Sequence, residues 1–116
     1  MAIKERIPCV YLLASAERGT LYAGVTSDLI KRVHEHKTDA VRGFTKEHRV
    51  HTLVWFEMHE TMESAILREK AIKEWKRAWK IELIEKANPY WHDLYTDLVD
   101  DSKALDSAFR RNDESI

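Results

Sequence analysis

Two short stretches near the start of the chain have the length and composition of β-strands. Residues 9–14 read Cys-Val-Tyr-Leu-Leu-Ala, the longest uncharged apolar run of the sequence, and residues 20–25 are also rich in β-forming side chains. A short segment that ends at Gly19 separates them. Strands joined by so short a connection run antiparallel, so the sequence predicts a β-hairpin as the start of an antiparallel sheet.

A helix and a third strand are expected after the hairpin. Ser27 or Asp28 can cap a helix over residues 29–36, where apolar side chains recur at helical spacing. Residues 38–49 are polar and predict a loop, whereas residues 51–58 have the composition of a strand.

A longer helical stretch can begin after a second capping residue, Thr61. No Gly or Pro interrupts it before Asn88-Pro89, and periodicity leaves open whether it breaks near Trp75. Residues 91–99 predict a last amphipathic turn or two. The predicted apolar stripe of the long stretch is Met62, Ile66, Ile72, Trp79 and Leu83. The order β-β-α-β-α-α indicates an α/β (α+β) fold, in which a small three-stranded antiparallel sheet is flanked by helices.

Length and composition restrict the kind of protein this can be. A chain of 116 residues suits one compact domain, and a single cysteine, Cys9, excludes an internal disulfide and a Cys-rich zinc cluster. No apolar run approaches the ~20 residues that cross a bilayer. Residues 4–6 are charged and are not followed by the longer apolar segment of a secretory signal. We therefore expect a cytoplasmic protein with no membrane contact.

The net charge of -1 averages two unlike regions. Residues 1–92 contain 16 Lys or Arg and 13 Asp or Glu, whereas residues 93–116 contain 3 and 7. Within the basic body, the segment from Arg68 to Lys80, the basic stripe, holds six cations against two Glu. Such a stripe could follow a phosphate backbone, although its composition alone favours a solvated helix face.

Glu69 is the polar residue that the helical pattern least explains. It lies three residues after Ile66 and three before Ile72, within the predicted apolar stripe. A buried carboxylate without a partner is strongly destabilising, so Glu69 should meet a cation, hydrogen-bond donors or a metal ion. Partial burial beside a neighbouring Arg is an equally weighted interpretation.

Two pairs of polar side chains could act together. Arg32 and His36 are four residues apart on one helix face, where they could grip a phosphate and move a proton. Tyr11 and Tyr22 lie at similar distances from the hairpin turn, so they can meet across the strand pair. Without further evidence, an Arg-His pair is typical of a solvated helix edge, and a pair of strand tyrosines is typical of a hydrophobic core. Hydroxyls that point into a cleft would instead be candidates for proton transfer or phosphate binding.

Taken in order, these residues resemble the signature of the GIY-YIG endonuclease superfamily. Its parts in this chain are Val10-Tyr11-Leu12, Leu21-Tyr22-Ala23-Gly24, Arg32 with His36, and Glu69. The chain is most similar to the small stand-alone bacterial members, over residues 6–95, and the similarity extends to residues 43–45 and 75–80. Ala23 replaces an isoleucine of the second motif, and Val25 stands where several members carry a lysine.

The resemblance implies metal-dependent hydrolysis of a phosphodiester by in-line attack of water. Glu69 would be the one protein ligand of a single divalent ion, Mg²⁺ or Mn²⁺, and Arg32 would neutralise charge on the phosphoryl oxygens. Tyr11 would help deprotonate the nucleophile with support from His36, because a tyrosine with its ordinary pKa of ~10 is a poor base at neutral pH. Tyr22 would position the water or the scissile phosphate.

The resemblance also implies contacts with nucleic acid, with DNA favoured and DNA repair or recombination as the setting. Gly24 would leave room for close backbone approach, and cations of the basic stripe would hold phosphates without reading sequence, so base specificity should be low. The predicted contacts are Gly24, Lys73, Lys76, Arg77 and Lys80. We expect residues 1–95 to form the nuclease-like domain and residues 96–116 an acidic, partly flexible tail.

Two rival functions stay open. One is a nucleic-acid-binding module with weak or lost catalysis, which Val25 and the modest charge of the body favour. The other is a protein without nuclease activity whose candidate residues form a buried hydrogen-bonded network; these would be Tyr11, Tyr22, Arg32 and Glu69. Six histidines suggest a zinc site, but none of their spacings is an i, i+4 helical pair. The sequence does not decide whether the nucleic acid is DNA or RNA, what structure the substrate has, or what the oligomeric state of the protein is.

Overall fold

The structure, a computed structural model, describes residues 6–38, 43 and 48–100. Most of the loop predicted over residues 38–49, including Phe44-Thr45 of the family resemblance, lies outside this part of the chain, as does the acidic tail from residue 101 onward. The described elements follow the order strand, strand, helix, strand, helix, helix, and residues 94–100 are also helical. The predicted fold class and element order are therefore confirmed.

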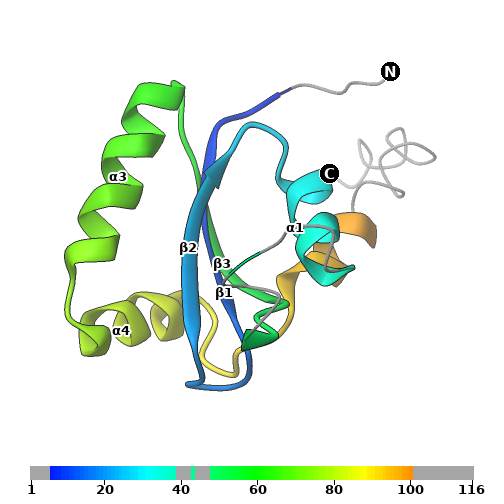
Figure 1. Cartoon of the computed structure of the whole chain (residues 1–116), viewed down its shortest axis with the longest axis vertical. Helices are drawn as coiled ribbons and strands as arrows, with labels where there is room; N and C mark the ends of the chain where they lie inside the picture. Colours follow the sequence, from blue (N-terminus) through cyan, green and yellow to red (C-terminus); the bar gives the residue numbers. More distant parts are fainter. Residues whose placement is uncertain (1–5, 39–42, 44–47, 101–116) are drawn as a thin grey trace, which may run out of the picture.

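A three-stranded antiparallel sheet forms the centre of the molecule (Figure 1). Strand β1, Cys9–Ala14, lies between β2, Leu21–Thr26, and β3, Thr52–Met58. Every residue of β1 is buried because the strand is covered on both faces, whereas β2 and β3 are the edge strands. The hairpin register places Tyr11 of β1 opposite Gly24 of β2.

Two helices begin at capping residues that the sequence predicts. Helix α1 spans Leu29–Lys37 and helix α3 spans Met62–Glu74. The side chains of Asp28 and Thr61 each accept a hydrogen bond from the backbone N–H three residues later, which satisfies a donor that the first helical turn leaves without an intrahelical partner.

The long helical stretch breaks at Trp75 and Lys76, whose backbones are extended between α3 and the next helix, α4, Arg77–Ala87. The break turns α4 away from the axis of α3 (Figure 1). The break also changes which residues of α4 face the core, because the helical periodicity of α3 does not continue into α4. The apolar stripe predicted for one continuous helix is therefore wrong at Trp79. Trp79 is 52% exposed, and Ile84 fills the core instead.

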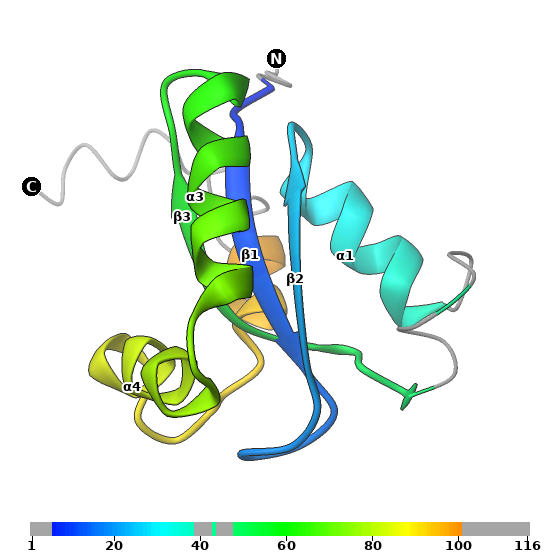
Figure 2. The same cartoon turned by 60° about the vertical axis from the view of Figure 1, so that its left-hand side comes forward.

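The helices cover the two faces of the sheet separately (Figure 2). Successive side chains of a strand point to opposite faces, so β1 contributes to both cores. The core on the α1 side contains Cys9, Tyr11, Leu13, Leu29, Val33, Val50 and Leu53. The core on the side of α3 and α4 contains Val10, Leu12, Ala14, Ala23, Val54, Trp55, Ala65, Ile72, Ile84 and Trp91. The edge strand β2 therefore has α1 on one side and α3 on the other.

Residues after α4 fasten the opposite edge of the sheet to α1. Asp93 pairs with Lys37 at the end of α1 and accepts a hydrogen bond of 3.2 Å from the backbone N–H of Leu53 in β3. The helical residues 94–100 follow directly, which confirms the predicted last turns. None of the helices in the described ranges is long and apolar enough to cross a membrane.

Candidate active site at the edge strand

The side chain of Tyr11 crosses the edge strand β2 at Gly24. A Cβ atom on Gly24 would lie 2.4 Å from the hydroxyl oxygen and 2.5 Å from the Cζ atom of Tyr11. Those distances are too short for any side chain, so only glycine fits opposite this tyrosine. The structure assigns the space at Gly24 to the Tyr11 ring, and a nucleic-acid contact at this glycine stays a prediction.

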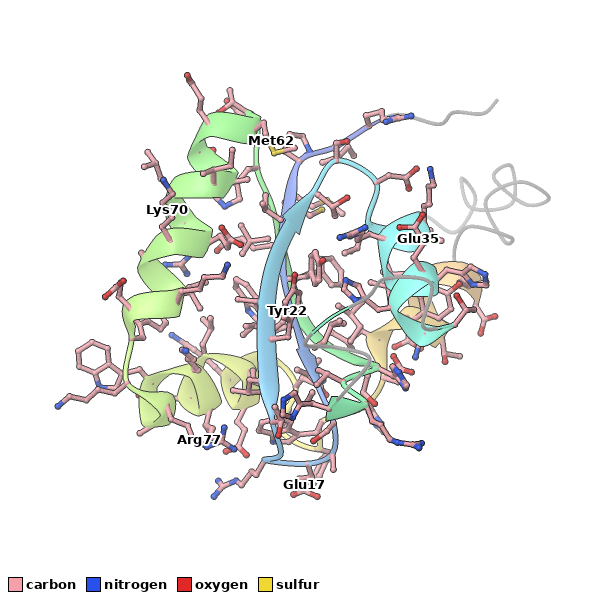
Figure 3. The ribbon with its side chains drawn as sticks, viewed as in Figure 1. Glu17, Tyr22, Glu35, Met62, Lys70 and Arg77 are labelled. Carbon is pink, nitrogen blue, oxygen red and sulfur yellow. The ribbon has the colours of Figure 1, made fainter. Side chains whose placement is uncertain are left out.

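Tyr11, Tyr22 and His36 form a cluster of three rings on the α1 side of the sheet. The hydroxyl oxygen of Tyr11 lies 3.1 Å from Nε2 of His36. The ring centroids are 6.4 Å apart for Tyr11 and Tyr22 and 5.4 Å apart for Tyr22 and His36. Tyr11 and His36 are each 1% exposed, whereas Tyr22, the second residue of β2 (Figure 3), is half-buried. The hairpin and α1 therefore bring together three of the residues that the sequence singles out.

Burial sets the protonation state of Tyr11. It raises the pKa of the hydroxyl to about 12, and the nearby Tyr22 and Glu69 act in the same direction. A hydrogen bond from Arg32 and its positive charge lower the pKa without cancelling the effect of burial. At neutral pH Tyr11 is therefore a protonated hydroxyl.

Burial acts in the opposite sense on His36. Together with the positive charge of Arg32 it lowers the pKa of His36 to about 4, while Glu35 opposes and His51 assists this shift. His36 is thus a neutral imidazole at neutral pH. Its Nε2 either accepts the hydroxyl proton of Tyr11 or donates to the hydroxyl oxygen, according to the tautomer.

Arg32 lies between the buried rings and solvent. Its Nη1 atom is 3.1 Å from Oε1 of Glu35. Glu35 is not among the site residues predicted from the sequence. The three-residue spacing of the two on one helix was the available signal for this pair. Arg32 and Tyr22 are partly exposed, whereas Tyr11 and His36 are buried, so Arg32 and Tyr22 are the members of this group that solvent reaches.

Glu69 reaches the edge strand from the opposite side. It shares a face of α3 with Ala65 and Ile72, which pack in the core against β1 and β2. The side chain is 13% exposed, and its Oε2 atom lies 2.9 Å from Nζ of Lys73. The predicted cation partner is present, as a lysine rather than an arginine. The charge of Glu69 contributes to the raised pKa of Tyr11, so the carboxylate is within electrostatic reach of that hydroxyl.

The site offers few protein ligands to a metal ion. Within residues 6–38, 43 and 48–100, no group of three or more His, Cys, Asp or Glu side chains is arranged to hold one. Mg²⁺ suits such a donor set, because it keeps several waters and is often bound by one or two carboxylates together with substrate phosphates. The hard, largely buried oxygens of Glu69 fit this requirement, and an ion there would compete with Lys73 for the carboxylate.

Besides Lys73, which pairs with Glu69, two further cations of the basic stripe have structural partners. The Nε atom of Arg68 donates to Oε1 of Glu57 at 3.0 Å, and its guanidinium lies 5.4 Å from the ring centroid of Trp75. Arg77 donates through Nη2 to the backbone carbonyl oxygens of Arg18 and Gly19 in the hairpin turn.

The cations of the stripe do not form one continuous face. Figure 3 shows Lys70 on the outer side of α3 and Arg77 at the hairpin end of the molecule, near Glu17. Lys76 and Lys80 lie beyond the break, at the start of α4. The stripe is therefore divided by the break, and phosphate contacts at Lys73, Lys76, Arg77 and Lys80 stay predictions.

Comparison with known proteins bears on this arrangement. The model of the GIY-YIG catalytic domain matches residues 7–82, a span that includes Tyr11, Tyr22, Arg32, His36 and Glu69. The chain belongs to the GIY-YIG family. The match to this nuclease-like family confirms the resemblance that the sequence motifs indicate.

Relatives of the GIY-YIG chain include UPF0213 proteins of Staphylococcus aureus strains Mu3, Mu50 and N315. Each is 36% identical over 77 residues, which cover 66% of this chain and 93% of the relative. These relatives are hardly longer than the matched region, as expected for a stand-alone GIY-YIG protein. No solved structure matches the chain.

Proposed function

We propose that this GIY-YIG protein is a divalent-metal-dependent endonuclease that hydrolyses phosphodiester bonds in nucleic acid, with DNA favoured and low base specificity. The observation that carries the proposal is the hydrogen bond between Tyr11 and His36, beside Arg32 and within the field of Glu69. These groups combine a path for a proton, a cation for phosphoryl oxygens and a carboxylate suited to a hard metal ion.

Substrate binding is assigned to the two partly exposed groups. The guanidinium of Arg32 offers several donors in a plane that matches phosphate oxygens, and it neutralises the charge that grows on them in the transition state. The hydroxyl of Tyr22 orients the phosphate or the attacking water. Arg32 and Tyr22 lie at the solvent-exposed side of the ring cluster, so they hold the phosphate next to Tyr11 and His36.

Proton transfer is assigned to Tyr11 and His36 as a relay. With a pKa of about 12, Tyr11 would be a phenolate in only about one molecule in 10⁵ at pH 7. The hydroxyl oxygen of Tyr11 instead accepts a proton from the attacking water while its own proton passes to Nε2 of His36. The charge of a bound phosphate raises the pKa of His36, because a nearby anion favours the imidazolium.

Glu69 is the residue that would hold Mg²⁺ or Mn²⁺, which when bound supplies Lewis-acid stabilisation of the leaving oxygen. Glu69 lies on the face of α3 that packs on the sheet, on the side opposite the ring cluster, and its charge acts on the Tyr11 hydroxyl.

A nucleic-acid-binding module with weak or lost catalysis is the second candidate. It is favoured by the ion pair of Glu69 with Lys73, which occupies the proposed metal ligand, and by Val25 at the position of a family lysine. This candidate uses the same surface and differs in having no metal-dependent turnover.

A cleavage assay separates the two candidates. Single-stranded, nicked, branched and duplex substrates are incubated with the wild-type protein in Mg²⁺ and in excess chelator. We expect chelator-sensitive cleavage by the wild type and by Glu74→Gln, an exposed control on the same helix, and none by Glu69→Gln. Full activity in Glu69→Gln would overturn the metal assignment. Binding without any cleavage by the wild type would establish the second candidate.

A further inference from the structure

Trp79 is the tryptophan whose place in the fold is not explained by packing. Trp55 and Trp91 are buried and Trp75 is half-buried, but Trp79 is 52% exposed on the first turn of α4. Aromatic side chains usually stabilise a protein through the large area that they bury. Much of the Trp79 indole remains in contact with solvent and makes no such contribution.

The Trp79 ring is nevertheless held in place. Its centroid lies 6.1 Å from that of Trp75, with the ring planes at 76°, so the two indoles meet edge to face. The Nζ atom of Lys76 lies 5.9 Å from the centroid of the Trp79 ring. An indole fixed by its neighbours loses little conformational entropy when a flat ligand stacks on it.

The surroundings of Trp79 are cationic. Residues 73–80 contain four cations, against the single carboxylate of Glu74. Lys73 pairs with Glu69 and Arg77 with the hairpin turn, which leaves Lys76 and Lys80 as the cations for a ligand at Trp79. Lys73 and Lys76 are exposed, Lys80 is half-buried, and the first turn of α4 has no acidic residue. Charged residues are depleted from the cores of protein interfaces, so an apolar protein partner is a poor fit. A ligand with flat rings and negative charges is a good one.

The corner between α3 and α4 is also close to the candidate active site. Glu69 precedes the end of α3 by five residues, which is about 7.5 Å along a helix axis. That length corresponds to about two nucleotide steps at a rise of ~3.4 Å. A strand whose scissile phosphate lies near Glu69 can therefore reach the corner within a few nucleotides.

We infer that this corner binds an unpaired nucleotide, with its base stacked on Trp79 and the adjacent phosphates held by Lys76 and Lys80. The inference rests on the proposed function and names its substrate class, which is nucleic acid with a single-stranded segment beside the cleavage point. The bases of a continuous duplex are stacked on one another and do not present a face to Trp79. An indole stacks on every base, so this contact adds affinity without sequence preference.

The test measures binding separately from cleavage. Glu69→Gln protein, used as the background so that substrates stay intact, is titrated in metal-free buffer into a labelled oligodeoxythymidylate and into the same strand paired with its complement. Fluorescence anisotropy gives the two dissociation constants. Trp79→Ala and Trp79→Phe are added to this background, with Leu67→Ala as a control for loss of an exposed apolar side chain on the neighbouring helix, since Leu67 is 68% exposed.

We expect Trp79→Ala to weaken binding of the single strand about tenfold and that of the duplex less than about twofold. Trp79→Phe should recover most of the single-strand affinity, and Leu67→Ala should change neither. Equal losses for the two ligands, no loss for the single strand, or no binding of either would overturn the inference. The nuclease proposal is judged separately by cleavage with Mg²⁺, so either can fail while the other stands. Circular dichroism of each variant checks that the fold is retained.

Discussion

The hydroxyl of Tyr11 lies 3.1 Å from Nε2 of His36, and burial moves the pKa of the two groups apart, to about 12 and about 4. Their hydrogen bond therefore joins two uncharged groups at neutral pH. Each group is supplied by a different element, Tyr11 by β1 and His36 by α1. The geometry of the pair consequently depends on how α1 packs on the sheet.

The buried His36 should make the fold less stable in mild acid. Its ordinary pKa of 6.5 applies to the unfolded chain and the value of about 4 to the folded one, so the unfolded chain binds more protons between these values. The contribution of His36 to the free energy of unfolding is therefore fully present above pH ~6.5. The free energy of unfolding then falls by about 3 kcal/mol as the pH drops to ~4. Urea unfolding at several pH values measures this. His36→Gln should lose that part of the pH dependence, and His34→Gln, an exposed control on α1, should keep it.

Gly24→Ala should displace the Tyr11 ring, because the new Cβ would lie 2.4 Å from its hydroxyl oxygen. We expect a loss of about 1–3 kcal/mol in the free energy of unfolding, typical of an overpacked site, and loss of most cleavage activity. A double-mutant cycle with Tyr11→Ala locates the cause. The cost of Gly24→Ala should nearly vanish when the Tyr11 ring is absent, and an unchanged cost would show that the steric conflict lies elsewhere.

Arg32→Ala should lower turnover far more than it lowers affinity for nucleic acid. Its proposed role is to meet charge that develops in the transition state, and loss of one such donor commonly costs ~3 kcal/mol, or about a hundredfold in rate. Single-turnover kinetics and equilibrium binding, measured on the same substrate, separate the two effects. Lys31→Ala removes a neighbouring exposed cation and should leave turnover almost unchanged. Equal losses in binding and turnover would make Arg32 a simple phosphate clamp.

Lys76 and Lys80 should account for part of the salt dependence of binding. Each phosphate contact contributes ~0.7 to the slope of log K against log salt on a single strand, so replacing both by Ala should flatten that slope by about 1.4 units. The loss should be similar for different base sequences, because phosphate contacts carry no sequence information. A slope that is unchanged in the double variant would identify these lysines as an ordinary solvated helix face.

Arg77→Ala sets the predicted phosphate contact at Arg77 against the structural role that its hydrogen bonds indicate, and the structural role predicts a loss of stability rather than a change in the salt slope. Its guanidinium donates to the carbonyl oxygens of Arg18 and Gly19, so it fastens the hairpin turn to α4. We expect a loss of about 1 kcal/mol in the free energy of unfolding and less than half a unit of change in slope. A flattening as large as that of a lysine variant would show that Arg77 also contacts phosphate.

Local signals in the sequence were enough to predict the elements that frame the site. Two strand-like runs and a short connection predict the hairpin, and the capping residues Asp28 and Thr61 mark the helix starts. The four-residue spacing of Arg32 and His36 predicts that they share a helix face. These properties depend on neighbours along the chain, which a sequence displays directly.

The rest depends on contacts that no local pattern encodes. The break at Trp75 contains neither Gly nor Pro, so the sequence leaves it open, and the exposure of Trp79 follows from that break. The role of Gly24 as space for the Tyr11 ring requires the strand register. The partner of Glu69 was predicted only as a class of group, and its identity as Lys73 depends on side-chain conformation.

Neither member of the Tyr11–His36 pair changes its protonation state across the pH range in which most enzymes are assayed. With pKa values of about 12 and about 4, neither group gains or loses a proton between pH 6 and pH 9, so the charge of this pair is constant in the free protein. A bend near neutrality in the pH profile of kcat/KM would therefore report a group outside this pair. The same bend in kcat alone would report the pair after a phosphate has entered, which makes the comparison of the two profiles a direct gauge of how substrate changes the site.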